Sequence, residues 1–296
     1  MDIYKELDEV YASGADVEAF LRERVAKAED EAELIILYNE LGSFLRGVSR
    51  FEESATAFEK AAELISETGD SVSLNFATTM NNLATTYRMM GDTANALKGY
   101  ETSMAVYRAL PETTPYLYAG VLNNLSALYL SEGKLKDAAE VSEETIRQLE
   151  QDASLSDELA TAKTNLASIY IRLGETDKAA SALDEALRIF ESADTESAHY
   201  PAALNNSALL KAFAGDYAGA AEIWKQTLEK IGRVFGENAD YAMTCRNLAR
   251  SMKKTGDREN AKRYLSKTAE LFEKIYGEDD PNTESVRTEL IELLKG

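Results

Sequence analysis

Five asparagines recur at one regular spacing, and their carboxamides suit them to hold the backbone of a bound peptide. A period of about 41 to 42 residues separates Asn82, Asn124, Asn165, Asn206 and Asn247. Asparagine is a mediocre helix former, so five copies forgo on the order of 3 kcal/mol relative to alanine. A carboxamide donates and accepts, so it can clamp a peptide amide without discriminating among side chains. The alternative is that each asparagine bonds the backbone of a neighbouring repeat and serves the fold.

Basic side chains accompany these asparagines. The segments 78–91, 120–133, 161–174, 202–215 and 243–256 contain eight bases and one acid, Glu132, although the whole chain has 52 acids, 32 bases and a net charge of −20. The bases are Arg88, Lys163, Arg172, Lys211, Arg246, Arg250, Lys253 and Lys254. Spacings of four and three place Arg246, Arg250 and Lys253 on one helix face. We expect these three, with Arg88 and Arg172, to contact an anionic ligand. The alternative is that the bases form ion pairs with neighbouring helices.

Residues for catalysis or metal binding are not grouped anywhere in the sequence. One cysteine, Cys245, and one histidine, His199, leave no disulfide framework and no metal site built from these residue types. No glycine loop suited to phosphate and no nucleophile with a base and an orienting acid is present. The sequence therefore predicts a protein that is not an enzyme, with no cofactor and no metal.

Charge and hydropathy restrict the partners and the compartment. The acidic chain would repel the phosphates of nucleic acid, and no run of about 18 apolar residues predicts a membrane span. The N-terminal residues lack the basic start and apolar core of a signal peptide, which indicates a cytoplasmic protein. We expect a protein or peptide partner, no nucleic acid, no membrane, and a monomer or weak homodimer.

A repeated pair of helices must position these side chains. Turn glycines keep the same spacing as the asparagines, and apolar residues recur at three and four, so each unit is predicted to be an antiparallel helical hairpin. Small residues such as Ala84 and Ala96 would face one another and let the two helix axes approach closely. A column of Phe76, Tyr118, Leu159, Tyr200 and Tyr241 is expected just before each first helix, packing between repeats. Six repeats cover 35–276, between a capping hairpin at 1–34 and a capping helix at 277–296.

The repeat pattern resembles a known family. The arrangement of Leu83, Ala84, Tyr87, Gly91, Ala96 and Tyr100, and its echoes, resembles the tetratricopeptide repeat (TPR). A period longer than the usual one of roughly 34 residues and the Asn-Asn-Leu-Ala start look like the variety found in kinesin light chains. The resemblance implies an all-α, right-handed superhelix whose first helices line the concave face. Related superhelices use an asparagine ladder to hold peptide backbone, and others use Asn with Lys or Arg to grip a terminal carboxylate.

These observations predict a non-catalytic adaptor that binds an extended peptide, acidic or carboxylate-ended, in its concave groove. Two alternatives remain open at this point. One is a regulatory receptor for a signalling peptide, and the other is a structural scaffold that self-associates through its terminal helix. Fold-level likeness carries the general function here, because one repeat architecture serves many unrelated pathways.

Overall fold

Helices account for every regular element that the structure describes. The structure is a computed structural model, and it describes residues 3–193 and 197–295. Within those residues the chain forms fifteen α-helices and one short 3₁₀ helix, with no strand. The all-α prediction is therefore confirmed. No described helix combines the length and apolar character needed to cross a bilayer.

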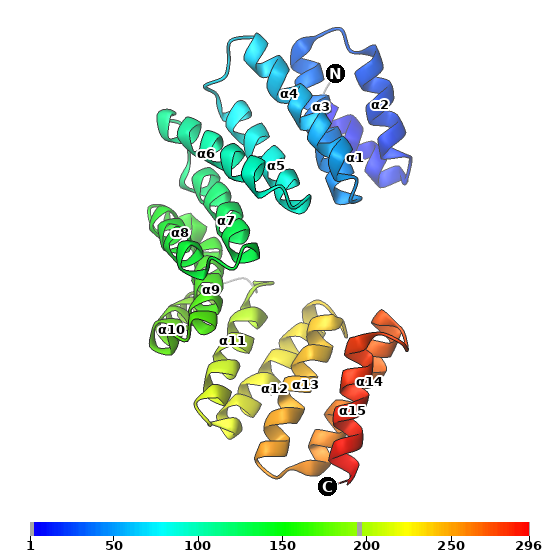
Figure 1. Cartoon of the computed structure of the whole chain (residues 1–296), viewed down its shortest axis with the longest axis vertical. Helices are drawn as coiled ribbons and strands as arrows, with labels where there is room; N and C mark the ends of the chain where they lie inside the picture. Colours follow the sequence, from blue (N-terminus) through cyan, green and yellow to red (C-terminus); the bar gives the residue numbers. More distant parts are fainter. Residues whose placement is uncertain (1–2, 194–196, 296) are drawn as a thin grey trace. The chain divides into compact units, whose positions relative to one another are not determined.

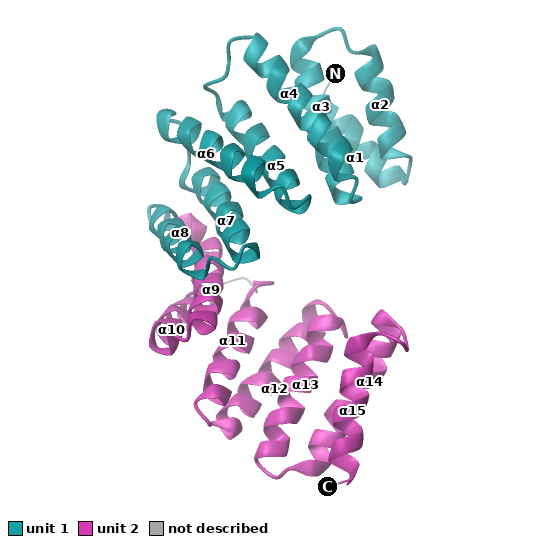
Figure 2. Ribbon diagram, in the orientation of Figure 1, with its two compact units in different colours: residues 1–152 teal, residues 153–296 magenta. Residues whose placement is uncertain are grey.

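The chain divides into two units, Met1–Asp152 and Ala153–Gly296 (Figure 2). Unit 1 contains α1 (Ile3–Ser13), α2 (Val17–Lys27), α3 (Glu31–Gly47), α4 (Phe51–Glu67), α5 (Leu74–Met89), α6 (Thr93–Ala109), α7 (Pro115–Ser131) and α8 (Leu135–Leu149). Unit 2 contains η1 (Ala153–Leu155), α9 (Ser156–Leu173), α10 (Thr176–Ser192), α11 (Tyr200–Phe213), α12 (Tyr217–Val234), α13 (Ala239–Lys254), α14 (Arg258–Tyr276) and α15 (Pro281–Lys295).

Consecutive helices pair as hairpins within each unit (Figure 1). The pairs are α3–α4, α5–α6 and α7–α8 in unit 1, and α9–α10, α11–α12 and α13–α14 in unit 2. The tight turn between paired helices needs a left-handed residue, which glycine adopts without a Cβ penalty. Gly174 ends α9 with φ 76°. In the first repeat the equivalent residue is Ser49, which adopts φ 62° at some cost in strain.

The first helix of each hairpin begins earlier than the sequence pattern predicts. That pattern starts α5 at Thr78, but Ser73 caps the helix by accepting a hydrogen bond from the amide of Phe76. Thr114 and Asn238 cap α7 and α13 in the same way. The predicted position of one column just before the first helices is therefore wrong. These residues lie inside the helices: Phe76, Tyr118, Leu159, Tyr200 and Tyr241. The start of each of these helices is set by a cap residue, which stands several residues before the first apolar residue of the repeat pattern.

Small residues and buried hydroxyls hold paired helices close together. A Cβ added at Gly99 of α6 would lie 2.7 Å from the Cβ of Ala84 in α5, so only glycine fits this crossing. The hydroxyl of Ser103 donates to the carbonyl oxygen of Ala77 at 2.7 Å, and that of Ser54 donates to the carbonyl of Gly42 at 2.7 Å. These bonds fix the rotation of α3 and α5 against their partner helices.

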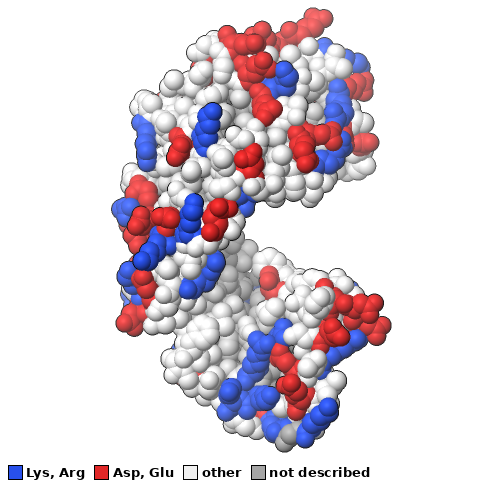
Figure 3. Space-filling view, in the orientation of Figure 1, with Lys and Arg blue, Asp and Glu red and all other residues white. Residues whose placement is uncertain are grey.

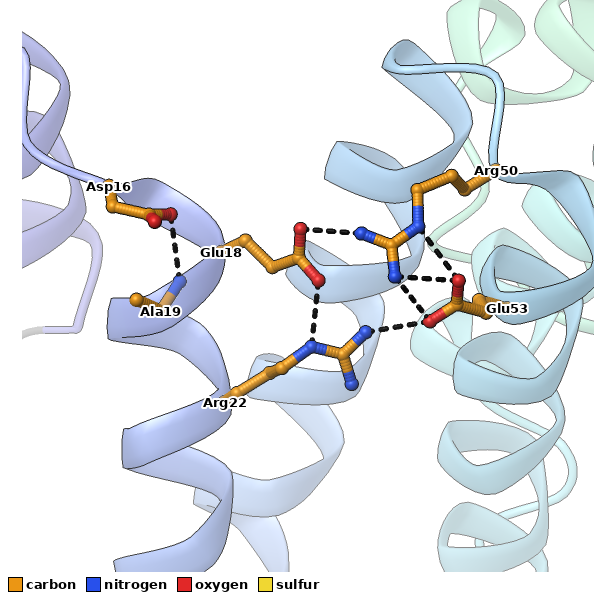
Figure 4. A network of polar contacts seen from close by, with 6 residues as sticks. All are labelled: Asp16, Glu18, Ala19, Arg22, Arg50 and Glu53. Carbon is orange, nitrogen blue, oxygen red and sulfur yellow. Dashed lines mark hydrogen bonds and ion pairs between the residues drawn. The ribbon is translucent and has the colours of Figure 1, made fainter.

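An N-terminal hairpin of α1 and α2 packs against the first repeat. Asp16 caps α2 by accepting a hydrogen bond from the amide of Ala19 at 3.0 Å. Beyond the cap, Arg22 of α2 reaches Glu53 of α4 at 2.8 Å, and Arg50 reaches back to Glu18 at 2.6 Å (Figure 4). Hydrogen bonds from Arg22 and Arg50 lower the pKa of Glu18. Exposed pairs of this kind add little stability individually, but their reciprocal geometry sets how the hairpin docks.

Helix α15 covers the last repeat of unit 2. It has no second helix, and it packs Val286 and Leu293 into the same apolar cluster as α12 to α14. Arg258 of α14 donates to the carbonyl of Leu293 at 2.6 Å. The polar residues that α15 turns toward α13 bear directly on the candidate site.

Candidate functional site

A pocket of about 650 Å³ opens on unit 2 beside α13. Its polar lining comes from Asn247, Arg250, Lys253, Lys254 and Glu289, and its apolar lining includes Leu209, Tyr217 and Trp224. Figure 3 shows Lys and Arg side chains gathered on the visible face of unit 2, beside acidic ones. The pocket therefore joins three cations, one carboxylate and one carboxamide to an apolar wall.

Two of these cations have no counterion. Lys253 and Lys254 are exposed near the end of α13, and neither forms an ion pair within the described residues. Asn247, half-buried almost two turns earlier, makes no side-chain hydrogen bond to a described residue. These groups are open to an incoming ligand at no cost of breaking an existing contact.

The other two predicted cations of α13 are bound within the chain. Arg246, whose side chain is 9% exposed, and Arg250, whose side chain is 54% exposed, both pair with the carboxylate of Glu289 on α15. Arg246 also donates to the hydroxyl of Ser285 at 2.6 Å. Burial acts to raise the pKa of Glu289, but hydrogen bonds from Arg250 and Arg246 outweigh it and leave that pKa lowered. Arg246 and Arg250 therefore form intramolecular ion pairs, which was the alternative to contact with an anionic ligand.

Charge on five of the six first helices is sorted by sign and by position. The observed α5, α7, α9, α11 and α13 contain the eight predicted bases and three acids, Asp157, Glu158 and Asp240. All three acids lie in first turns, where a negative charge complements the helix dipole. Glu132 lies beyond the end of α7. Away from their first turns these helices carry bases and no acids.

In unit 1 the asparagines of the column have partners inside the chain. Asn82 accepts hydrogen bonds from the guanidinium of Arg46, through its backbone oxygen at 3.0 Å and its side-chain oxygen at 3.4 Å. Asn124 donates from Nδ2 to the side-chain oxygen of Asn81 at 3.1 Å. Both contacts join adjacent repeats, and they leave the Nδ2 group of Asn82 and the Oδ1 atom of Asn124 without a described partner.

In unit 2 the asparagines of the column have no hydrogen-bond partner among the described residues. Asn165 is exposed, Asn206 and Asn247 are half-buried, and none of the three makes a side-chain hydrogen bond to a described residue. Their neighbour Asn205 differs, because its side-chain oxygen accepts from the indole of Trp224 at 2.9 Å. The carboxamides of unit 2 therefore have the open donors and acceptors that backbone binding requires.

The four remaining predicted bases differ in their surroundings. Lys211 is exposed and pairs with Asp216 at 3.2 Å. Arg172, at the end of α9, is exposed and has no ion pair among the described residues. Lys163 is buried, and its ammonium donates to Glu185 at 2.7 Å. Arg88 is half-buried, and its Nε atom is enclosed with no described acceptor.

Sequence reasoning missed Arg46. It lies one repeat period before Arg88, at the same repeat position, and it bridges α3 to α5 through Asn82. Extending the repeat spacing backward from Arg88 would have found it. The sequence makes the first repeat look degenerate, because Ser49 stands in place of the turn glycine.

Other reactive residue types are inert or dispersed. Cys245 is fully buried in α13, and burial raises the pKa of its thiol to about 12. Among residues 3–193 and 197–295, no three His, Cys, Asp or Glu side chains cluster in a way that could hold a metal ion. The candidate site therefore consists of hydrogen-bonding and charged side chains.

Comparison with known proteins places the repeats in a family. The tetratricopeptide-repeat profile matches residues 33–109, 75–151, 117–192 and 158–231, and a second profile of the same repeat matches 242–282. No curated protein is a significant match to the chain.

Solved structures share the fold. BtubC (BKLC) from P. vanneervenii is 25% identical with a TM-score of 0.67, over 77% of this chain and 92% of that one. A putative kinesin light chain repeat protein from Podosopora anserina is 20% identical with a TM-score of 0.54, over 67% and 96%. The quorum sensor NprR from B. thuringiensis is 14% identical with a TM-score of 0.61, over 99% and 84%. With its repeats matched over most of its length, this chain belongs to the tetratricopeptide-repeat family.

Proposed function

We propose that this protein is a non-catalytic adaptor that binds an extended, acidic or carboxylate-ended peptide along the first helices of unit 2. The observation that carries the proposal is the pocket beside α13, where Lys253 and Lys254 lack counterions and Asn247 lacks a hydrogen-bond partner among the described residues. Two cations on one wall favour an acidic ligand, and open carboxamides favour a backbone that is not already paired in secondary structure.

The ion pair of Glu289 refines which residues contact the ligand. Because Arg246 and Arg250 already hold a carboxylate of this chain, their proposed role changes from direct contact to shaping the pocket. Lys253 and Lys254 then supply the charge-assisted contacts, and Asn247, Asn206 and Asn165 supply hydrogen bonds to the peptide backbone. Leu209 and Tyr217, which are both half-buried, offer an apolar surface for one side chain of the ligand.

A selection from a display library of random linear peptides tests the proposal even though the partner is unidentified. We expect the wild-type protein to enrich sequences rich in Asp and Glu or dependent on a free C-terminus. A double variant, Lys253→Glu with Lys254→Glu, should bind the enriched peptides at least about tenfold more weakly, a loss of about 1.4 kcal/mol.

The matched control is Lys262→Glu with Lys274→Glu, which makes the same charge change on α14 of the same unit. This control should keep the wild-type affinity, apart from a small effect of the altered net charge at low salt. Equal loss in the two double variants would mean that net charge alone governs binding. Enrichment of uncharged sequences would remove the acidic ligand from the proposal.

A further inference from the structure

A small pocket of about 260 Å³ opens in unit 1 at the junction of two consecutive repeats. It lies where the end of α6, the start of α7 and the end of α8 meet, and its lining includes Arg108, Tyr118, Glu144 and Gln148. Pockets for drug-sized ligands measure roughly 300 to 1,000 Å³. This pocket therefore suits a smaller molecule, and it shares no lining residue with the pocket beside α13.

Two hydroxyl groups of this lining are enclosed without a partner. Tyr118 is 6% exposed, and neither its phenol oxygen nor the hydroxyl oxygen of Thr113 forms a hydrogen bond with a described group. Arg108 lies over the Tyr118 ring, 5.5 Å from its centre, but a guanidinium has only donors and cannot accept the phenol proton. Because both hydroxyl residues line the pocket, a ligand there can supply the missing acceptor.

Another repeat junction shows which acceptor belongs at this place. Tyr118 and Tyr200 hold the same position in the repeat, at the start of α7 and of α11. At the α10–α11 junction the hydroxyl of Tyr200 donates to the carboxylate of Glu191 at 3.2 Å. Arg108 and Glu191 are themselves equivalent, because each follows the matched alanine of its second helix by twelve residues. The α6–α7 junction thus has a cation where the α10–α11 junction has a carboxylate.

The charges around the pocket favour a singly charged anion. Arg108 is exposed and forms no ion pair with a described residue. Glu144 is already engaged, because it accepts hydrogen bonds from Gln148 at 2.6 Å and from Arg147 at 2.9 Å. Its charge would repel a phosphate dianion more strongly than a carboxylate. Burial raises the pKa of Tyr118, so the phenol keeps the proton that it would donate.

We propose that this pocket binds a small carboxylic acid, whose carboxylate is held by Arg108 and by the hydroxyls of Tyr118 and Thr113. All three groups can donate, which matches a ligand group that only accepts. The site goes beyond the proposed peptide-binding function, because it lies in unit 1 and uses no residue of the asparagine column. A bound acid would connect α6 to α7, so binding should stabilise the junction between the two repeats.

A titration of the ¹⁵N-labelled protein, followed through its backbone amide signals, tests the site. The probes are propionate, its uncharged analogue propionamide, inorganic phosphate, and a capped Gly-Glu-Gly tripeptide, all at one ionic strength. We expect propionate to cause saturable shifts in residues 107–118 and 144–151, and propionamide to cause none. A titration to on the order of 10 mM reaches roughly nine-tenths occupancy for a Kd of about 1 mM.

Variants separate binding from a structural role. Arg108→Gln and Tyr118→Phe should each weaken propionate binding at least about tenfold, because each removes a hydrogen bond to a charged group. Tyr118→Phe should also keep or raise the melting temperature, because it removes a buried hydroxyl that has no acceptor. Arg108→Glu recreates the arrangement at Glu191 and should abolish binding. The matched control, Lys98→Glu, makes the same charge change at an exposed position of α6 and should bind propionate as the wild type does.

The proposal is overturned if propionate causes no saturable shift, if propionamide binds equally well, or if Tyr118→Phe binds propionate as the wild type does. Saturation by phosphate or by the tripeptide without propionate would also reject the small acid. The tripeptide result would then assign the pocket to an acidic side chain of a protein partner. These variants lie in unit 1 and those of the proposed function lie in unit 2, so either account can fail while the other stands.

Discussion

Replacing Glu289 with glutamine tests whether the cations of α13 belong to the fold. The substitution keeps the volume of the side chain but removes the charge that pairs with Arg246 and Arg250. Breaking a fully buried pair costs about 3 to 5 kcal/mol. Here the side chain of Arg246 is 9% exposed but that of Glu289 is 25% exposed, and the new amide oxygen can still accept one hydrogen bond. We therefore expect a loss of about 2 kcal/mol in the free energy of unfolding of unit 2.

Urea unfolding followed by tryptophan fluorescence measures this loss in the right place. The chain has one tryptophan, Trp224 of α12, which is buried in the same cluster as α15. The matched control is Glu292→Gln, because Glu292 is exposed on α15 without a described partner. It should change stability by less than about 0.5 kcal/mol.

The pH dependence has a defined sign. The folded pKa of Glu289 lies below its ordinary value of 4.5, so the ion pair contributes fully above that value. The contribution is lost as pH falls through the folded pKa. The difference in stability between wild type and Glu289→Gln should thus be constant near neutral pH and shrink in acid. A loss of unfolding free energy at neutral pH that is no larger than that of the control, under about 0.5 kcal/mol, would refute the reasoning. Arg246 and Arg250 would then again be candidates for direct contact with the ligand.

Three further substitutions test the geometry that supports the site. Gly99→Ala should lower the melting temperature, because overpacking against Ala84 costs about 1 to 3 kcal/mol and the gain in helix propensity is only about 1 kcal/mol. Gly120→Ala should raise the melting temperature, because its new Cβ meets nothing within 4 Å. A shift of the two melting temperatures in the same direction would contradict the close crossing. Cys245, with its thiol pKa raised to about 12, should react with a disulfide reagent only as fast as the protein opens, so a rapid burst at pH 8 would disagree. Asn165→Ala should leave urea stability unchanged or higher, because the exposed carboxamide bonds nothing described; a clear loss would assign it to the fold.

Local signals explain why the hairpins were predictable. The spacing of the asparagines and the turn glycines follows directly from one repeated unit, and Gly174 takes the left-handed conformation that the pattern implies. The close crossing at Ala84 follows from side-chain volume alone. Helix starts were misplaced because caps such as Ser73 stand outside the apolar periodicity.

Partners of individual side chains depend on contacts that a single sequence does not display. Glu289 meets Arg246 across 43 residues, and only the register of α15 against α13 decides that pairing. Asn124 and Asn165 share a repeat position, yet one bonds Asn81 and the other bonds no described residue. The repeat therefore fixes where a side chain stands, while its neighbours in adjacent repeats decide whether it is free to bind.

Photo-crosslinking of a selected peptide tests the central claim most directly. A peptide from the display selection, carrying a benzophenone side chain beside its acidic residues, is irradiated with the wild-type protein, and the crosslinked residues are identified by mass spectrometry. We predict crosslinks on α11 and α13, around Leu209, Asn247 and Lys253. Crosslinks confined to residues of α10, α12 and α14 that lie outside the pocket lining would contradict the account and place the binding surface elsewhere on unit 2.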